Sequence, residues 1–285
     1  MSKTKEIKTR IESVKKTKKI TQAMKMVSAA KFKRNLAQLD HIKEFGEGIE
    51  SILSSLSKRL FEDDIPALIQ ENDSPQTAII VVSSDRGLCG GFNSNLFKKV
   101  NQEISKYQQV DLYLIGNKAQ QFFKSKNVKI ADHITAFKSD NLDTEMRNYI
   151  DSFIDSFKQG VYSNVIVIYN EFVSALTSNQ VVKQLLPVSL PDWDKTTTTH
   201  SDFIYESSKE NALESLFIKT IEYQFSRSVY ESFASEEGFR MAAMDSATTN
   251  AKEMIQELTL FFNRSRQAAI TTELTEIVAG AASIS

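Results

Sequence analysis

MAAMDSATTNAKEMIQELTLFFNRSRQAAITT, residues 241–272, is the stretch of sequence that decides the fold of this chain. Ten of its residues follow one another at alternating steps of three and four without a break. They are Met241, Met244, Thr248, Ala251, Ile255, Leu258, Phe262, Ser265, Ala269 and Thr272. This heptad spacing predicts a helix that packs along its length against a second helix. Many of the ten side chains are small or polar, which suits a partner helix that approaches closely.

The other end of the chain offers that partner. All four prolines lie between residues 66 and 191, so both ends lack the strongest helix breaker. Apolar residues recur through residues 1–60 at mostly three- and four-residue steps, with Gly46 and Gly48 as weak points. Helices over residues 1–60 and 207–285 would be roughly 85 to 115 Å long, whereas a small domain is about 30 Å across. We therefore expect an antiparallel two-helix coiled coil; a helix packed on its own domain is the alternative.

Between these helices, the period of the sequence changes to that of an α/β domain over residues 75–190. TAIIVV, residues 77–82, is a β-branched run that predicts a buried strand. Further strands are expected at 111–115 and 165–169, with a possible edge strand at 181–186, and helices at about 95–106, 117–126 and 142–157. Strands that alternate with helices predict a mostly parallel, Rossmann-like sheet. Residues 61–75 and 187–206 are expected to be linkers.

The composition favours a folded protein that binds other proteins. Hydrophobic residues make up 41% and charged residues 25% of the chain. Residues 1–34 hold twelve Lys or Arg but only Glu6 and Glu12, whereas the whole chain has a net charge of −1. A basic face of this kind suits nucleic acid, an anionic membrane or an acidic protein. Because the remainder of the chain is strongly acidic, we favour a protein partner.

The loop SDRGLCGGFN, residues 84–93, follows the first predicted strand, where nucleotide-binding loops often lie. Its glycines match neither the phosphate-binding spacing G-x-x-x-x-G-K-[ST] nor the dinucleotide spacing G-x-G-x-x-G. We therefore interpret Gly87, Gly90 and Gly91 as turn-forming residues, and the lone Cys89 as a buried packing thiol. An enzyme that uses this loop remains the alternative.

Other catalytic and metal-binding patterns are missing from the sequence. His41, His133 and His200 lie in separate segments, and one cysteine cannot build a zinc site. No run is apolar enough to span a membrane, and the N-terminus lacks the features of a signal peptide. A single cysteine also suits a reducing compartment. The sequence thus predicts no catalytic residue, no metal and no cofactor.

Three blocks of the chain closely resemble the gamma-subunit family of F-type ATP synthases, of the bacterial type. They are ITQAMKMVSAAK at 20–31, SDRGLCGGFN at 84–93, and FRMAAMDSATTNA with NRSRQAAITTEL at 239–251 and 263–274. The resemblance follows the whole chain in order, although residues 107–210 match by layout more than by residue. Phe239 departs from the pattern, because the family usually has a small residue there.

The resemblance implies a rotor shaft and not an enzyme. It implies three alpha and three beta subunits around the shaft, an epsilon subunit and the membrane-embedded c-ring as partners. Proton flow through the complex would turn the shaft, and the complex would lie peripherally on the cytoplasmic face of a bacterial plasma membrane. Carried over by position, Met24 and Lys25 would face an acidic segment of beta. Arg266 and Gln267, with Arg240 on the same helix, would engage a beta loop.

Two other functions remain open at this level. A basic coiled-coil scaffold or nucleic-acid-binding protein would use residues 1–34, and its binding would weaken steeply with salt. An enzyme would bind a nucleotide at the loop of residues 84–93, which lacks the required Lys-Ser or Lys-Thr.

Overall fold

The computed structural model describes residues 2–57, 66–135, 142–189 and 209–282. The chain forms two compact units by its internal contacts. Residues 1–29 and 240–285 make the helix-pair unit, and residues 30–239 make the α/β unit. Helices α1 (Ser2–Ser57) and α5 (Lys209–Ala282) each contribute residues to both units. The long helices expected at 1–60 and 207–285 are therefore confirmed over 2–57 and 209–282, and the ends of both predictions, with parts of the expected linkers at 61–75 and 187–206, lie outside the described residues.

A five-stranded sheet forms the middle of the α/β unit, with the strand order β3-β2-β1-β4-β5. Its strands are β1 (Gln76–Val82), β2 (Gln109–Ile115), β3 (Lys129–Ile134), β4 (Asn164–Ser174) and β5 (Thr177–Leu186). The first four are parallel neighbours, and β5 pairs antiparallel with β4 at one edge. The mostly parallel sheet and its edge strand at 181–186 agree with expectation, but β3 was not predicted.

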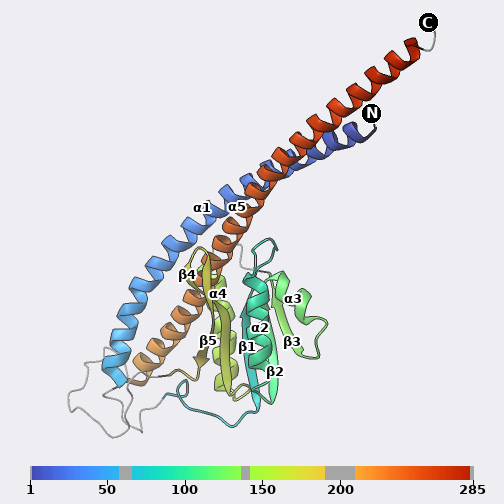
Figure 1. Ribbon diagram of the computed structural model, residues 1–285. Coiled ribbons are helices and arrows are strands. Elements are labelled where there is room, and N and C mark those ends of the chain that lie inside the picture. The colour runs from blue at the N-terminus through green and yellow to red at the C-terminus, as the bar shows by residue number, and fades with distance from the viewer. Residues whose placement is uncertain (1, 58–65, 136–141, 190–208, 283–285) are drawn as a thin grey trace. The chain divides into compact units, whose positions relative to one another are not determined.

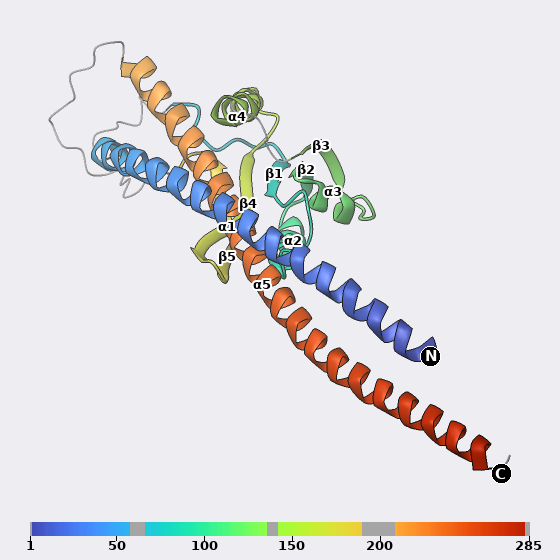
Figure 2. The same ribbon diagram turned by 90° about the horizontal axis from the view of Figure 1, so that it is seen from above.

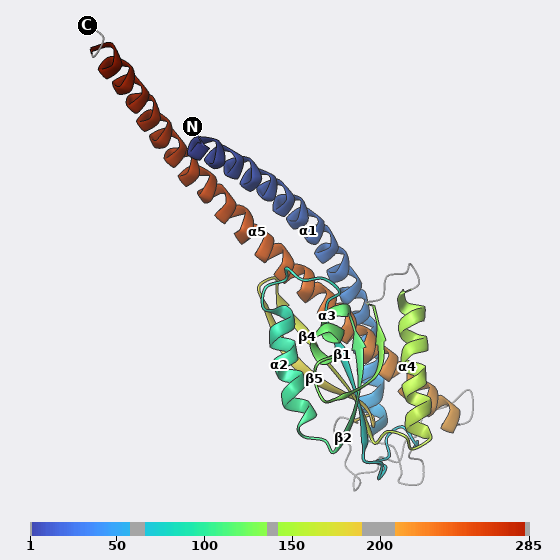
Figure 3. The same ribbon diagram turned by 90° about the vertical axis from the view of Figure 1, so that its right-hand side faces the viewer.

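Helices cover both faces of this sheet (Figure 1, Figure 3). On one face, α2 (Phe92–Ile104) and α3 (Asn117–Phe123) pack Leu96, Phe97 and Phe123 against alternate residues of β1, β2 and β4. On the other face lie α4 (Leu142–Lys158) and the parts of α1 and α5 that belong to this unit. Strand β1 is buried on both faces, which explains why it reads as an unbroken apolar run.

The α1 and α5 segments of the α/β unit approach each other closely. A Cβ atom added to Gly46 of α1 would overlap the ring of Tyr223 of α5. Gly48, which follows Gly46 in α1 and lies on another side of the helix, has no atom within 4 Å of the equivalent position. Gly46 therefore leaves room for the ring of Tyr223, whereas the space next to Gly48 is empty of other atoms.

In the helix-pair unit, α1 and α5 run antiparallel side by side (Figure 1, Figure 2). The hydroxyls of Thr21 and Thr248 lie 2.8 Å apart, and Lys25 Nζ lies 2.6 Å from Asp245 Oδ1. Of the ten heptad positions on α5, Met244 and Ala251 are buried and seven are half-buried. Thr272 is exposed, contrary to its predicted place in the seam. Extending the register residue by residue places Ser2, the start of α1, opposite Gln267, so Thr272 lies beyond the reach of its partner helix.

Candidate functional site

The loop of residues 84–93 is held by its own side chains at the carboxyl end of β1. Asn93 Oδ1 accepts a hydrogen bond from the backbone N–H of Ser84 at 3.2 Å, and Asn93 Nδ2 donates to Ser84 Oγ at 2.7 Å. Ser84 Oγ in turn donates to the carbonyl of Arg86 at 2.8 Å. Cys89 is buried beside these groups, and Asn93 Nδ2 lies 3.4 Å from its Sγ. The loop is thus a closed network, and the polar groups named here are used within it.

The backbone of this loop turns in the left-handed region at two positions that are separated by one residue. Gly90 has a φ of 55°, and Leu88 has a φ of 65°. Gly91 has a φ of −83° and immediately precedes α2. Of the three glycines interpreted as turn-forming, Gly90 is therefore the one whose φ an L side chain would rarely adopt.

The carboxyl edge between β1 and β4 is where an open α/β sheet usually binds its ligand. Strands β2 and β3 follow β1 on one side, and β4 and β5 lie on the other, so the strand order reverses there. In this chain α5 occupies that edge. Ser232 Oγ donates to the carbonyl of Val82 at the end of β1, and Ser235 Oγ donates to the carbonyl of Asn170 in β4, each at 3.2 Å. A helix of the chain itself stands where a nucleotide would bind, which argues against the enzyme alternative.

Phe239 of α5 closes the same edge over the glycine loop. Its ring lies 6.3 Å from that of Phe92, centroid to centroid, at the start of α2. Its Cδ1 atom is 3.7 Å from where a Gly90 Cβ would be. The large side chain of Phe239 therefore packs over the turn that a phosphate would need to approach.

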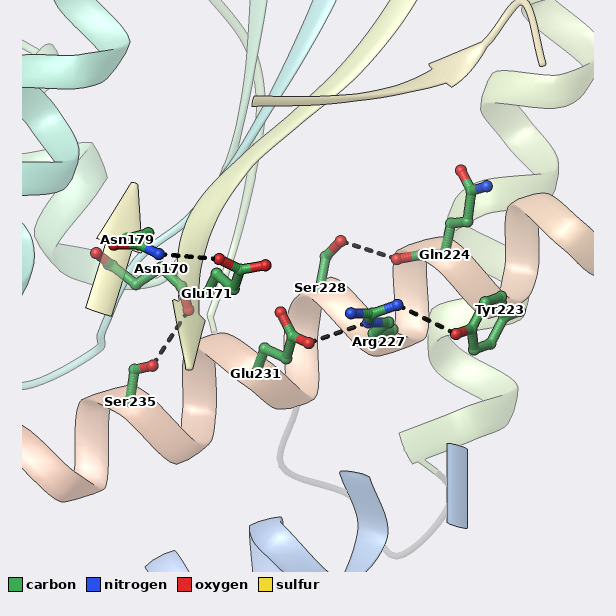
Figure 4. Close-up of polar contacts among 9 residues, drawn as sticks. All are labelled: Asn170, Glu171, Asn179, Tyr223, Gln224, Arg227, Ser228, Glu231 and Ser235. Carbon is green, nitrogen blue, oxygen red and sulfur yellow. Dashed lines mark hydrogen bonds and ion pairs between the residues drawn. The ribbon is translucent and has the colours of Figure 1, made fainter. Parts of the chain in front are cut away.

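A polar cluster follows α5 next to this edge (Figure 4). Arg227 lies between two partners on its own helix: its Nε donates to Glu231 Oε1 at 3.0 Å, and its Nη1 donates to the Tyr223 hydroxyl at 3.4 Å. Burial lowers the pKa of Arg227, but the bonds to Glu231 and Tyr223 outweigh burial and raise it above its ordinary value. Burial and the negative charge of Glu231 raise the pKa of Tyr169 in β4. The raised pKa values keep Arg227 charged and Tyr169 neutral near neutral pH, so these two side chains are suited to structure and not to proton transfer.

A groove of about 250 Å³ lies between α1, α4 and α5 within the α/β unit. Arg147 Nε and Lys219 Nζ on its rim lie 3.4 and 2.7 Å from the two carboxylate oxygens of Glu222. The volume is below that of common small-molecule sites, and these two rim cations already have a carboxylate partner. Among the described residues, no group of three or more His, Cys, Asp or Glu could hold a metal ion.

The residues expected to couple the shaft to its partners all lie in the helix-pair unit, in different surroundings. Met24 is half-buried, and Lys25 forms its ion pair with Asp245 while 40% of its side chain stays exposed. Arg240 is buried, with 7% of its surface exposed. Arg266 and Gln267 are exposed and lie where α1 begins opposite α5. The structure therefore leaves Lys25, Arg266 and Gln267 accessible to another chain, whereas Arg240 is largely covered.

Large apolar side chains are exposed along both helices of the helix-pair unit. They are Ile20, Met26 and Val27 on α1, and Met254, Leu260, Phe261, Ile270, Leu274, Ile277 and Val278 on α5. An extended set of exposed apolar residues marks a surface that contacts other molecules. The exposure of these large side chains was not predicted from the sequence, because spacing alone does not show which residues a partner helix covers. Within the described part of the chain, no helix has both the length and the hydropathy to cross a membrane.

Comparison with known proteins identifies close relatives along the whole chain. A family model described as ATP synthase matches residues 3–284. The ATP synthase gamma chain of Glaesserella parasuis is 39% identical over 289 residues, which cover 100% of both chains. The ATP synthase gamma chain of a Geobacter species is 41% identical over 288 residues, which cover 100% of this chain and 99% of that one.

Solved structures share the fold at much lower identity. A chain in the mitochondrial ATP synthase of Euglena gracilis, an OSCP/F1/c-ring assembly in rotational state 3, has a TM-score of 0.71 and 17% identity, covering 99% of this chain and 95% of that one. A chain in the rotor of the ATP synthase from the same organism has a TM-score of 0.65 and 15% identity, covering 94% and 99%. These likenesses support the architecture of long terminal helices with a central sheet.

Proposed function

This chain belongs to the ATP synthase gamma-chain family, and from that premise we propose that it is the central rotor shaft of an F-type ATP synthase. It is a non-catalytic subunit that associates with the other subunits of the complex. The observation that best supports the shaft is the exposed apolar surface of the helix-pair unit, because an isolated soluble protein seldom presents such an extended surface.

The partners we propose are three alpha and three beta subunits around the helix-pair unit, an epsilon subunit and the c-ring. The shaft would carry rotation of the c-ring to the catalytic sites on beta. A rotating shaft changes the affinity of a site only as far as it contacts the conformations of beta differently. A shift from 1:99 to 99:1 between two conformations needs about 5.5 kcal/mol, so many contacts must act together.

The proposed coupling residues come from the family resemblance, and the accessibility of Lys25, Arg266 and Gln267 supports three of them. We propose that Arg266 and Gln267 engage a loop of beta, and that Met24 and Lys25 face an acidic segment of beta. We keep Arg240 among the proposed coupling residues. Because so little of its surface is exposed, we propose that it acts from within the helix-pair unit. We also propose that the two helices form a coiled coil, that the moving ion is the proton, and that the complex lies on the cytoplasmic face of the plasma membrane.

The test is reconstitution of a complex that lacks its shaft. The purified chain, added to alpha and beta subunits, epsilon and the c-ring, is expected to restore ATP hydrolysis that is coupled to proton pumping. Gln267→Ala and Arg266→Ala are expected to lower multi-site turnover and leave assembly intact. Gln256→Ala, an exposed glutamine on the same helix, is the matched control and should behave as the wild type. Failure of the wild-type chain to restore coupled activity would overturn the proposal.

The scaffold or nucleic-acid alternative makes a different prediction. Binding of the chain to duplex DNA would fall steeply between about 50 and 200 mM salt, because each phosphate neutralised by Lys or Arg releases counterions. Under the rotor proposal the lysines and arginines of α1 face protein carboxylates, so no such DNA binding is expected at physiological salt.

A further inference from the structure

Three residues of α5 contact three successive features of the sheet at its carboxyl edge. Ser232 bonds the end of β1, and Ser235 bonds β4, through the backbone carbonyls of Val82 and Asn170. Gly238 meets the turn between β4 and β5: a Cβ atom at this position would lie 2.9 Å from the Ala175 carbonyl oxygen and 3.1 Å from its Cα. We call these three residues the α5 contact row.

The spacing of the row matches the spacing of the strands. Three residues of an α-helix rise about 4.5 Å, and neighbouring strands lie about 4.8 Å apart. Successive turns of α5 therefore meet β1 and then β4, with one hydroxyl for each strand. One helical turn further along α5, Gly238 has no side chain, so the helix backbone can lie directly against the backbone that connects β4 and β5. Rotation of α5 about its axis would remove all three contacts at once.

The residues at each end of the row prevent α5 from sliding to an equivalent position. Toward the start of α5, Glu231 is only 2% exposed and is held by Arg227 next to Tyr169. Toward the end, Phe239 packs against Phe92. A shift of α5 by four residues would place the ring of Phe239 or the carboxylate of Glu231 where Ser235 now lies, which opposes sliding by one turn.

Asn170 joins this contact to the rest of the α/β unit. It is fully buried, and its side-chain oxygen accepts a hydrogen bond from Gln180 Nε2 of β5 at 2.9 Å. Its side-chain nitrogen lies 3.4 Å from the carbonyl of Phe92 at the start of α2. Asn170, which accepts the hydrogen bond from Ser235, is thus itself held by β5 and α2, so its position under α5 is fixed.

We propose that the α5 contact row, Ser232, Ser235 and Gly238, fixes the rotational angle of α5 on the sheet, so that torque passes between the α/β unit and α5 without slip. The three residues are positioning residues, because they touch no reacting group. The angular role follows from the contacts alone, and the role in torque rests on the proposed function.

The experiment uses the reconstituted complex in membrane vesicles and measures protons pumped per ATP hydrolysed. The variants are Ser232→Ala with Ser235→Ala, and separately Gly238→Ala. Matched controls are Thr220→Val, a buried hydroxyl of α5 that bonds the Leu216 carbonyl of its own helix, and Gly48→Ala, a helical glycine with open space around it. We expect the row variants to assemble and hydrolyse ATP but to pump fewer protons per ATP, and the controls to match the wild type.

A second measurement follows the rotational angle of the α/β unit relative to the alpha–beta head. A bead is attached through Lys98→Cys, an exposed position on α2, while the alpha–beta head is fixed to a surface. The row variants should broaden the angular distribution of the bead, and the controls should not. A wild-type pumping ratio and an unbroadened distribution in the row variants would overturn the proposal. Absence of coupled pumping by the wild-type chain would instead overturn the proposed function.

Discussion

Helix α5 has two different environments along its length. In the α/β unit, every residue from Phe225 to Phe239 is buried or half-buried, whichever side of the helix it lies on. In the helix-pair unit, from Lys252 onward, only one narrow seam is even half-buried. A helix covered all round belongs to a core, whereas one covered along a seam leaves its remaining surface for partners. The difference indicates that the α/β unit anchors α5 and that the helix-pair unit presents it.

The largest expected effect is the loss of an aromatic ring from the anchored part. Phe217→Ala, at a fully buried position, should destabilise the α/β unit by roughly 3–5 kcal/mol. Phe262→Ala, at a half-buried seam position, should cost only about 1 kcal/mol, because much of its surface already meets water. Urea unfolding, monitored by hydrogen exchange of individual peptides, would measure the loss of stability in both variants. Equal losses would contradict the division into anchored and presented segments.

A smaller effect is expected where α1 meets α5 in the α/β unit. Gly46→Ala would bring a Cβ atom into the ring of Tyr223 and should cost roughly 1–3 kcal/mol of unfolding free energy through overpacking. Gly48→Ala is the matched control: its added methyl group meets nothing, so helix propensity should stabilise the chain by about 0.5–1 kcal/mol. The same denaturation experiment decides, and a stabilising Gly46→Ala would show that α1 and Tyr223 are not packed as described.

The smallest effect concerns a buried and an exposed ion pair. Burial raises the pKa of Glu103, but hydrogen bonds from Lys106 and Lys99 outweigh it and lower the pKa below the ordinary 4.5. The stabilisation is therefore complete above pH 4.5 and is lost as the pH falls through the lower folded-state pKa. Glu103→Gln should cost about 1 kcal/mol at pH 7 and flatten this acid-side loss of stability.

The exposed pair supplies the comparison. Asp245→Asn, which breaks the pair with Lys25 in the helix-pair unit, should change stability by about 0–1 kcal/mol, and the change should shrink in high salt. Unfolding at several pH values and salt concentrations measures both variants. A larger, salt-insensitive loss in Asp245→Asn than in Glu103→Gln would show that the exposed pair is the stronger of the two.

Most of the fold was predictable because its signals are periodic. Heptad steps indicated α5, and an apolar run indicated β1. Strand β3 was missed because KIADHI is largely exposed at the sheet edge and lacks both an apolar run and a clean alternation. Thr272 was placed in the seam because spacing alone does not reveal where the shorter partner helix begins.

The contact row was not predictable for a different reason. Ser232 and Ser235 are polar residues in a helix, and from sequence they resemble the solvent-facing side of that helix. Both are buried because strand carbonyls lie opposite them, and this pairing depends on residues 150 and 65 positions away. Gly46 was similarly interpreted as a weak point, since nothing near it in the sequence indicates Tyr223. In contrast, the coupling role of Arg266 and Gln267 was predicted from a recognisable block of sequence, and it stays a prediction.

The position of α5 at the switch point of the sheet has a consequence for how firmly it is held. A diffusible ligand at this edge would be released at low concentration and could be displaced by a competitor. Helix α5 is joined to the sheet by the same polypeptide, so its effective concentration at that edge stays high whatever the composition of the solution. The sheet thus binds α5 as an intramolecular ligand, and a metabolite that resembles the usual occupants of such a crevice would have to compete with this high local concentration.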